Sequence, residues 1–210
     1  MSKNPFAPAI EGALELAEVV VDSKISNEIL SDIPFVGLAF KAASAAENYR
    51  QYALEKKIHL FCSEPNLRAA IEAKRLREKL LTDEKQDQQI GEMLLMVLDK
   101  VTDMTKPVLL AKIFAAYLDE VIEQESLLML THVIDISYIG DVLTFINTRK
   151  GEFDNSNLWR ERLASTGLLE THVSGAIGNA GDIHHEPSPL GLTLYDIIDH
   201  YENQQEQQPT

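Results

Sequence analysis

The chain has a single cysteine, Cys62, among its 210 residues. An intramolecular disulfide needs two cysteines, so none can form, and a reducing compartment is the natural one. The first twelve residues also lack the basic stretch and apolar run of a secretory signal. The sequence therefore predicts a cytoplasmic protein.

Basic residues are scarce. The chain has 19 lysines and arginines against 33 aspartates and glutamates, which gives a formal net charge of −14. Phosphate groups would be repelled over most of such a surface, so the charge disfavours nonspecific binding to DNA or RNA. For the same reason, it disfavours an anionic membrane as a default partner.

Long apolar runs are missing as well, since no segment approaches the ~20 apolar residues that span a bilayer. The best candidate, 33–46, is short and contains Lys41. It is interpreted either as a core helix of a bundle, which we favour, or as a helix that binds a membrane or a partner. In the second case the residues used would be Phe35, Val36, Leu38 and Phe40.

What the chain does have is helical periodicity. Its apolar content of 45% is ordinary for a protein with a packed core. Apolar residues at helical spacing predict a first helix over 8–22 and further helices that begin near Pro34, Pro65, Asp83 and Thr105. The stretch 127–146 is broken at Gly140 and predicts two helices or one kinked helix. The expected fold is mainly α, with a bundle of about six or seven helices over 1–147.

The texture changes after Asn147, and residues 148–201 predict a small separate module. A short helix over 159–165 should close at Gly167, because glycine commonly ends helices. The alternation in 168–173 predicts a strand, and Ser188-Pro189 predicts the start of a last helix. Residues 202–210 are rich in Gln and Glu and are predicted to form a disordered tail.

Two steps in this module resemble the end of a winged helix: Gly167-Leu168-Leu169 and Ser188-Pro189-Leu190-Gly191. The resemblance implies a third helix, a two-stranded wing and a re-entrant helix, in that order. Winged helices often bind DNA. Here the implied recognition helix offers only Arg160 and Arg162, and the implied wing carries Asp182 and Glu186. A module for packing or protein contact is therefore favoured over a DNA-binding regulator.

The middle of the chain is similar to an uncharacterised bacterial all-helical family. The similarity lies in the Ile33-Pro34 to Gly37 helix start, in residues 111–117 and in the Ile134-Asp135 to Asp141 stretch. It implies a link to mobile elements or phage defence.

Three clusters could carry chemistry. His132 and Asp135 share a helix face and could bind a metal together with Asp141, as in a small hydrolase. Pairing at a helix junction is favoured, because no second ligand pair of matched spacing appears. His184-His185-Glu186 could bind zinc from a predicted loop, although adjacent residues on a strand point to opposite faces, which hinders joint ligation. His59 and Cys62 have the spacing of a chance pair rather than of a base and a nucleophile.

A glycine-rich segment, 175–181, lacks the lysine and hydroxyl residues of a phosphate loop and is interpreted as a linker. No cofactor is predicted. One basic helix offers a docking face for an acidic partner, or balances an acidic neighbour. Its residues are Arg68, Lys74, Arg75, Arg77 and Lys79.

The favoured function is a non-enzymatic interaction or regulatory protein with a protein partner, and a homo-oligomer is left open. The alternatives are an effector that acts at a membrane through 33–46, a metal-dependent hydrolase and a winged-helix DNA binder.

Overall fold

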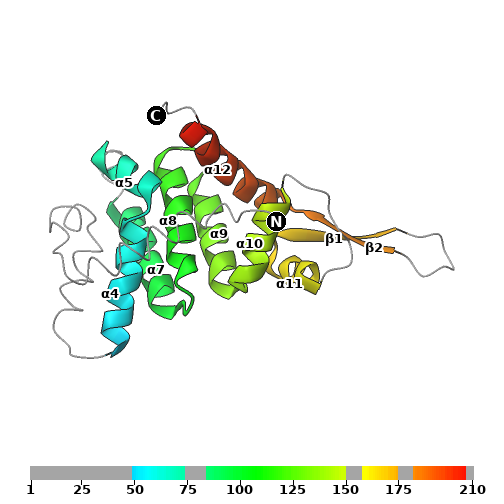
Figure 1. The fold of residues 1–210 in the computed structure, drawn as a ribbon, viewed down its shortest axis with the longest axis horizontal. Helices are drawn as coiled ribbons and strands as arrows, with labels where there is room; N and C mark the ends of the chain where they lie inside the picture. Colours follow the sequence, from blue (N-terminus) through cyan, green and yellow to red (C-terminus); the bar gives the residue numbers. More distant parts are fainter. Residues whose placement is uncertain (1–48, 74–83, 150–157, 175–181, 207–210) are drawn as a thin grey trace. The chain divides into compact units, whose positions relative to one another are not determined.

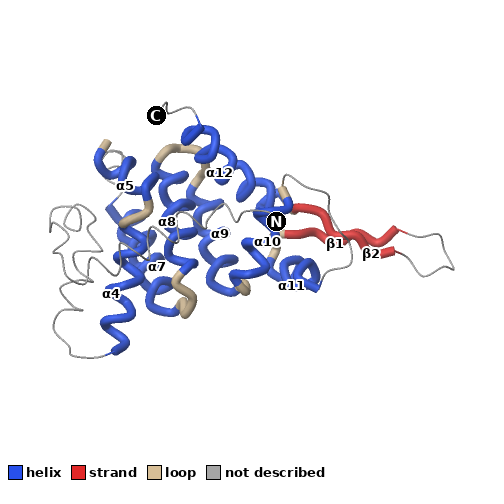
Figure 2. Tube along the Cα trace, in the orientation of Figure 1, coloured by secondary structure: helices blue, strands red, loops and turns tan. Residues whose placement is uncertain are grey.

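A computed structural model describes residues 49–73, 84–149, 158–174 and 182–206 of the chain. These residues form eight helices and one two-stranded sheet (Figure 1, Figure 2). The predicted fold class, mainly α with a small β element near the C-terminal end, is confirmed. The chain divides into two compact units between Glu123 and Gln124, termed here the N-terminal and C-terminal units.

The N-terminal unit contains α4 (Tyr49–Cys62), α5 (Pro65–Glu72), α7 (Glu84–Lys100) and α8 (Thr105–Leu118). Helix α8 packs against α4 and α5, and α4 also packs against α7. Every residue of α8 after Thr105 is buried. The rings of Phe114 on α8 and Phe61 on α4 lie 6.0 Å apart between centroids. A helix that is apolar on nearly all sides, like α8, is one that the fold buries.

Two helices of this unit begin at the signals that the sequence carries. The Glu64 carboxylate accepts a hydrogen bond from the N–H of Leu67 at 2.8 Å, and Pro65 follows it at the start of α5. Before α8, the Asp103 carboxylate accepts a hydrogen bond from the N–H of Thr105 at 2.8 Å. These acceptors satisfy N–H groups that no helical carbonyl can reach. The helix starts predicted at Pro65 and Thr105 are confirmed.

The C-terminal unit begins with three helices, α9 (Gln124–Ile136), α10 (Ile139–Thr148) and α11 (Leu158–Thr166). An antiparallel hairpin of β1 (Leu169–Ser174) and β2 (Asp182–Pro187) follows, and α12 (Pro189–Glu206) ends the unit. Helix α12 packs against α9 and α10, while α11 packs against α10 and β1. The break predicted near Gly140 is confirmed as the junction between α9 and α10.

The C-terminal end of α11 and the N-terminal end of α12 meet where the hairpin begins. Gly167 ends α11 with a φ of 92°, a left-handed conformation that glycine adopts without strain. The Ser188 hydroxyl donates to the Gly167 carbonyl at 2.6 Å and accepts from the N–H of Gly191 at 3.0 Å. Ser188 therefore caps α12 and fastens it to the end of α11.

Two local predictions are corrected. His184-His185-Glu186 lies in strand β2 rather than in a loop, because residues 182–187 pair along their whole length with 169–174. Helix α12 continues to Glu206, so residues 202–206 of the predicted disordered tail are helical. The Gln and Glu side chains there are good helix formers.

Several predictions fall on other parts of the chain. The helix predicted over 8–22, the apolar segment 33–46 and the glycine-rich segment 175–181 lie outside the described residues. The sequence predicted a module boundary after residue 147, whereas the contacts group α9 and α10 with the elements that follow them.

Candidate functional site

The three candidate metal ligands His132, Asp135 and Asp141 do not converge. His132 is exposed on α9, while Asp141 is buried in the first turn of α10. The Nε and Nη2 groups of Arg162 donate to the two Asp141 oxygens at 2.6 and 2.7 Å, which occupies the carboxylate. Within the described residues, no three His, Cys, Asp or Glu side chains are arranged to hold a metal ion. Asp141 instead joins α10 to α11.

The two arginines of the implied recognition helix are used inside the C-terminal unit. Arg160 is buried, and its guanidinium carbon lies 5.0 Å from the centroid of the Trp159 ring. Arg162 is partly exposed but bound to Asp141, and this hydrogen bond raises the pKa of its guanidinium. Helix α11 therefore directs its cationic groups to the protein's own side chains.

Cys62 has the surroundings of a structural cysteine. It is buried at the end of α4, and burial raises the pKa of its thiol to about 12. Because the thiolate is the reactive form, the side chain is inert near neutral pH. Burial also lowers the pKa of His59. The interpretation of His59 and Cys62 as a chance pair stays a prediction.

The predicted basic docking face is only partly visible. Arg68 is exposed on α5, whereas Lys74, Arg75, Arg77 and Lys79 lie outside the described residues. The four residues of the predicted membrane or partner helix, Phe35, Val36, Leu38 and Phe40, also lie outside them. Both stay predictions.

The hairpin of β1 and β2 carries two of the exposed apolar side chains of the C-terminal unit, Val173 and Ile183. Figure 1 shows its strands extending away from α10, α11 and α12. The register pairs Leu169 with Pro187 near the helices and Val173 with Ile183 further out. Leu169 is buried, whereas every later residue of β1 is exposed. In the outer part of the hairpin, beyond Leu169 and Pro187, β1 therefore exposes both of its faces.

The two faces differ in chemistry, because successive residues of a strand point to opposite sides. One face, which we term the apolar face, carries Thr171 opposite His185 and Val173 opposite Ile183. The other, which we term the polar face, carries Glu170 opposite Glu186 and His172 opposite His184. Val173 is 71% exposed and Ile183 is 59% exposed. The apolar face thus ends in an uncovered pair of β-branched side chains.

Side-chain contacts tie the two strands together on both faces. The Nδ1 atom of His185 lies 3.1 Å from the Thr171 hydroxyl. On the polar face, the Nε2 atom of His184 lies 2.8 Å from the Ser174 hydroxyl. An isolated two-stranded hairpin is only marginally stable in water, so the exposed end depends on such cross-strand pairs.

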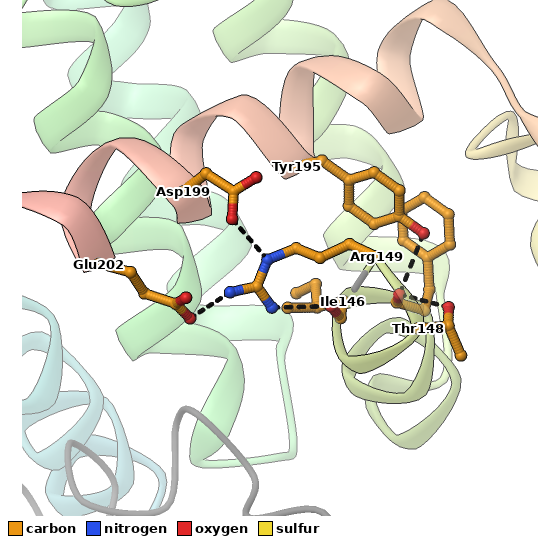
Figure 3. A network of polar contacts seen from close by, with 7 residues as sticks. Ile146, Thr148, Arg149, Tyr195, Asp199 and Glu202 are labelled. Carbon is orange, nitrogen blue, oxygen red and sulfur yellow. Dashed lines mark hydrogen bonds and ion pairs between the residues drawn. The ribbon is translucent and has the colours of Figure 1, made fainter. Parts of the chain in front are cut away.

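A buried arginine fastens α12 to the end of α10 (Figure 3). Arg149 donates from Nε to the Asp199 carboxylate at 2.9 Å and from Nη1 to the Ile146 carbonyl at 2.9 Å. It also forms an ion pair with Glu202. We refer to Arg149, Asp199 and Glu202 as the clasp.

A second contact lies beside the clasp. The Tyr195 hydroxyl donates to the Phe145 carbonyl at 3.1 Å, and the two rings stack with centroids 4.3 Å apart. Burial raises the pKa of Tyr195 to about 12, so the hydroxyl keeps its proton and remains a donor. The clasp and this pair fix α12, and through Ser188 they fix the root of the hairpin.

Sequence reasoning missed the Val173–Ile183 pair and the clasp. A signal for the second strand was present, because Ile183 and His185 alternate with His184 and Glu186. Arg149 carried no comparable signal, since basic residues near helix ends are common.

Among the described residues, no helix combines the length and the apolar composition that crossing a bilayer requires. In comparisons with known proteins, no family model, no curated protein and no solved structure matches the chain.

Proposed function

We propose that the protein is a non-enzymatic interaction module that binds a protein partner through the apolar face of the hairpin. The observation that carries this proposal is the exposed Val173–Ile183 pair, on strands that extend away from the helices. Full burial of one such side chain stabilises by about 1.5–3 kcal/mol. A partner that covers both residues would gain part of that energy from each side chain, less the cost of association.

Charge defines the chemistry of the partner. The chain has a net charge of −14, and Glu170 and Glu186 lie on the polar face, on the other side of the hairpin from the apolar pair. A complementary surface has an apolar patch flanked by lysine or arginine, which would speed association and fix its orientation.

The same charges favour a protein over DNA. Arg160 is buried, and Arg162 is bound to Asp141, so α11 offers little to a phosphate backbone. The acidic residues of the hairpin would repel phosphates. We therefore keep from the winged-helix resemblance the position of the contact, on the hairpin, and propose a protein in place of DNA as the partner.

A photo-crosslinking amino acid at position 173, in cells that carry the native gene, tests the proposal. We expect one discrete protein adduct, which a matched crosslinker at exposed Leu192 on α12 does not give. With that partner purified, titration calorimetry should show affinity at least about tenfold weaker for the double variant Val173→Ser, Ile183→Ser. The control Leu192→Ser should bind like the wild type.

Other outcomes would contradict the proposal. Adducts with nucleic acid or lipid at position 173 would favour the DNA-binding or membrane alternatives. Adducts with a second copy of the chain would replace the basic partner with self-association. Equal affinity of the wild type and the double variant would move the contact away from the hairpin.

A further inference from the structure

The polar face of the hairpin brings together two histidines that are twelve positions apart in the sequence. His172 and His184 occupy directly opposed positions, and Glu170 and Glu186 form the neighbouring pair on the same face. The Cβ atoms of opposed residues in an antiparallel pair are ~4.5–5.5 Å apart. The two imidazoles therefore share one small region of the surface.

The His184 ring has a contact of the kind that orients a metal ligand, whereas the contact of His172 is longer than a hydrogen bond. The Nε2 atom of His172 lies 3.7 Å from a Glu170 oxygen, and the Nε2 atom of His184 lies 2.8 Å from the Ser174 hydroxyl. A histidine that binds metal through one nitrogen commonly gives its other N–H to a carboxylate or another acceptor. Where the His184 Nε2–H donates to the Ser174 hydroxyl, Nδ1 of His184 is left for a metal ion.

We propose that His172 and His184 chelate a divalent transition-metal ion between the two strands, with water completing its coordination. Imidazole is a suitable ligand for zinc, nickel and copper. The bond from zinc to an imidazole nitrogen is ~2.0–2.1 Å long. The carboxylates of Glu170 and Glu186 add negative charge beside the ion. Within the described residues no three His, Cys, Asp or Glu side chains are arranged to hold an ion, so neither carboxylate is assigned as a ligand.

This assignment differs from a site formed by the adjacent His184 and His185. His185 lies on the opposite face, is buried and contacts Thr171, so it does not reach the same ion. The chelate uses the face opposite Val173 and Ile183, so metal binding can be measured without the proposed partner. A bound ion would link β1 to β2 where both strands are exposed.

Titration of the full chain with zinc or nickel chloride near neutral pH tests the site, followed by calorimetry and by imidazole NMR signals. We expect one ion per chain and perturbed signals of His172 and His184. Affinity should follow the order copper above nickel and zinc, above manganese, with no competition from magnesium.

Single variants decide which side chains bind. His172→Ala and His184→Ala should each weaken binding at least about tenfold, since one ligand of two is lost. His132→Ala and His200→Ala, on helices of the same unit, are the matched controls and should leave affinity unchanged. No binding at millimolar zinc, or an equal loss in the controls, would overturn the assignment. So would unaltered affinity in either hairpin variant, or effective competition by magnesium, which would indicate the carboxylates alone.

Discussion

Removing the carboxylates of the clasp should destabilise the protein more than removing its arginine. The Arg149 side chain is 4% exposed, whereas Asp199 is 45% and Glu202 is 25% exposed. Arg149→Met leaves two carboxylates that water can hydrate. The double variant Asp199→Asn, Glu202→Gln leaves a buried guanidinium that keeps its hydrogen bond to the Ile146 carbonyl but has lost both carboxylates of the clasp.

The magnitudes follow from this burial. Removing the counter-charge of a buried ion costs about 3–5 kcal/mol. The Ile146 hydrogen bond and the partial exposure of the carboxylates place the double variant at the low end, at about 3 kcal/mol. Methionine keeps the packing of the arginine stem and loses charge-assisted hydrogen bonds, for about 1–2 kcal/mol. The double variant should therefore be the less stable of the two.

Urea denaturation followed by tryptophan fluorescence measures the difference directly. Trp159 is the chain's single tryptophan and is buried in the C-terminal unit, so its signal reports on the unit that holds the clasp. With a slope of about 1–3 kcal/mol per molar urea, both shifts in midpoint are measurable. The slope should stay constant, which shows that the same surface is exposed in each variant.

The Asp141–Arg162 pair supplies the reversed case, because here the carboxylate is buried and the arginine is half exposed. Removing the exposed partner, by Arg162→Met, should therefore destabilise more than Asp141→Asn.

If Arg149→Met shifts the midpoint as far as the double variant does, burial of the charge does not set the cost and the reasoning is refuted.

Three further outcomes are expected. A Cβ at Gly191 would collide with the Leu168 carbonyl oxygen, so Gly191→Ala should destabilise by about 1–3 kcal/mol in thermal denaturation, and an unchanged midpoint would contradict that close approach. Cys62 should resist iodoacetamide at mildly alkaline pH until urea unfolds the chain, whereas rapid labelling of the folded protein would show that its thiol is accessible. Burial raises the pKa of Glu64 above its usual 4.5, so the folded state holds this proton more tightly than the unfolded chain does. The stability of the wild type relative to the Glu64→Gln variant should then fall as the pH rises from the pKa of Glu64 in the unfolded chain to its pKa in the folded protein. If the denaturation midpoints of the two proteins differ by the same amount at every pH, the pKa shift is refuted.

Much of the helical fold is written locally and could be predicted. Glu64-Pro65 and Thr105 mark helix starts because their effects act within one turn. Gly167 marks a helix end for the same reason, since glycine adopts a positive φ without strain. The end of α12 was predicted too early, because a polar composition was interpreted as disorder although Gln and Glu favour helix.

The candidate site could not be predicted in the same way. Strand alternation says that residues 170 and 172 share a face, but not that His184 lies opposite His172. That register depends on how many residues separate the strands. The direction of Arg160 and Arg162 also depends on tertiary partners, because Asp141 lies 21 positions before Arg162. From the charge alone, the sequence argued against DNA binding, but it could not show that these two arginines contact other residues of the same unit.

The clasp has a consequence for how the hairpin can change. Arg149 and Asp199 are 50 positions apart, so their ion pair closes a long loop that contains α11 and both strands. In a chain with one cysteine, charge closes this loop where a secreted protein could use a disulfide. Loop closure becomes costlier by only about 0.6 kcal/mol for each doubling of length. The clasp thus allows the outer part of the hairpin to change in sequence and length without weakening the contact between α10 and α12.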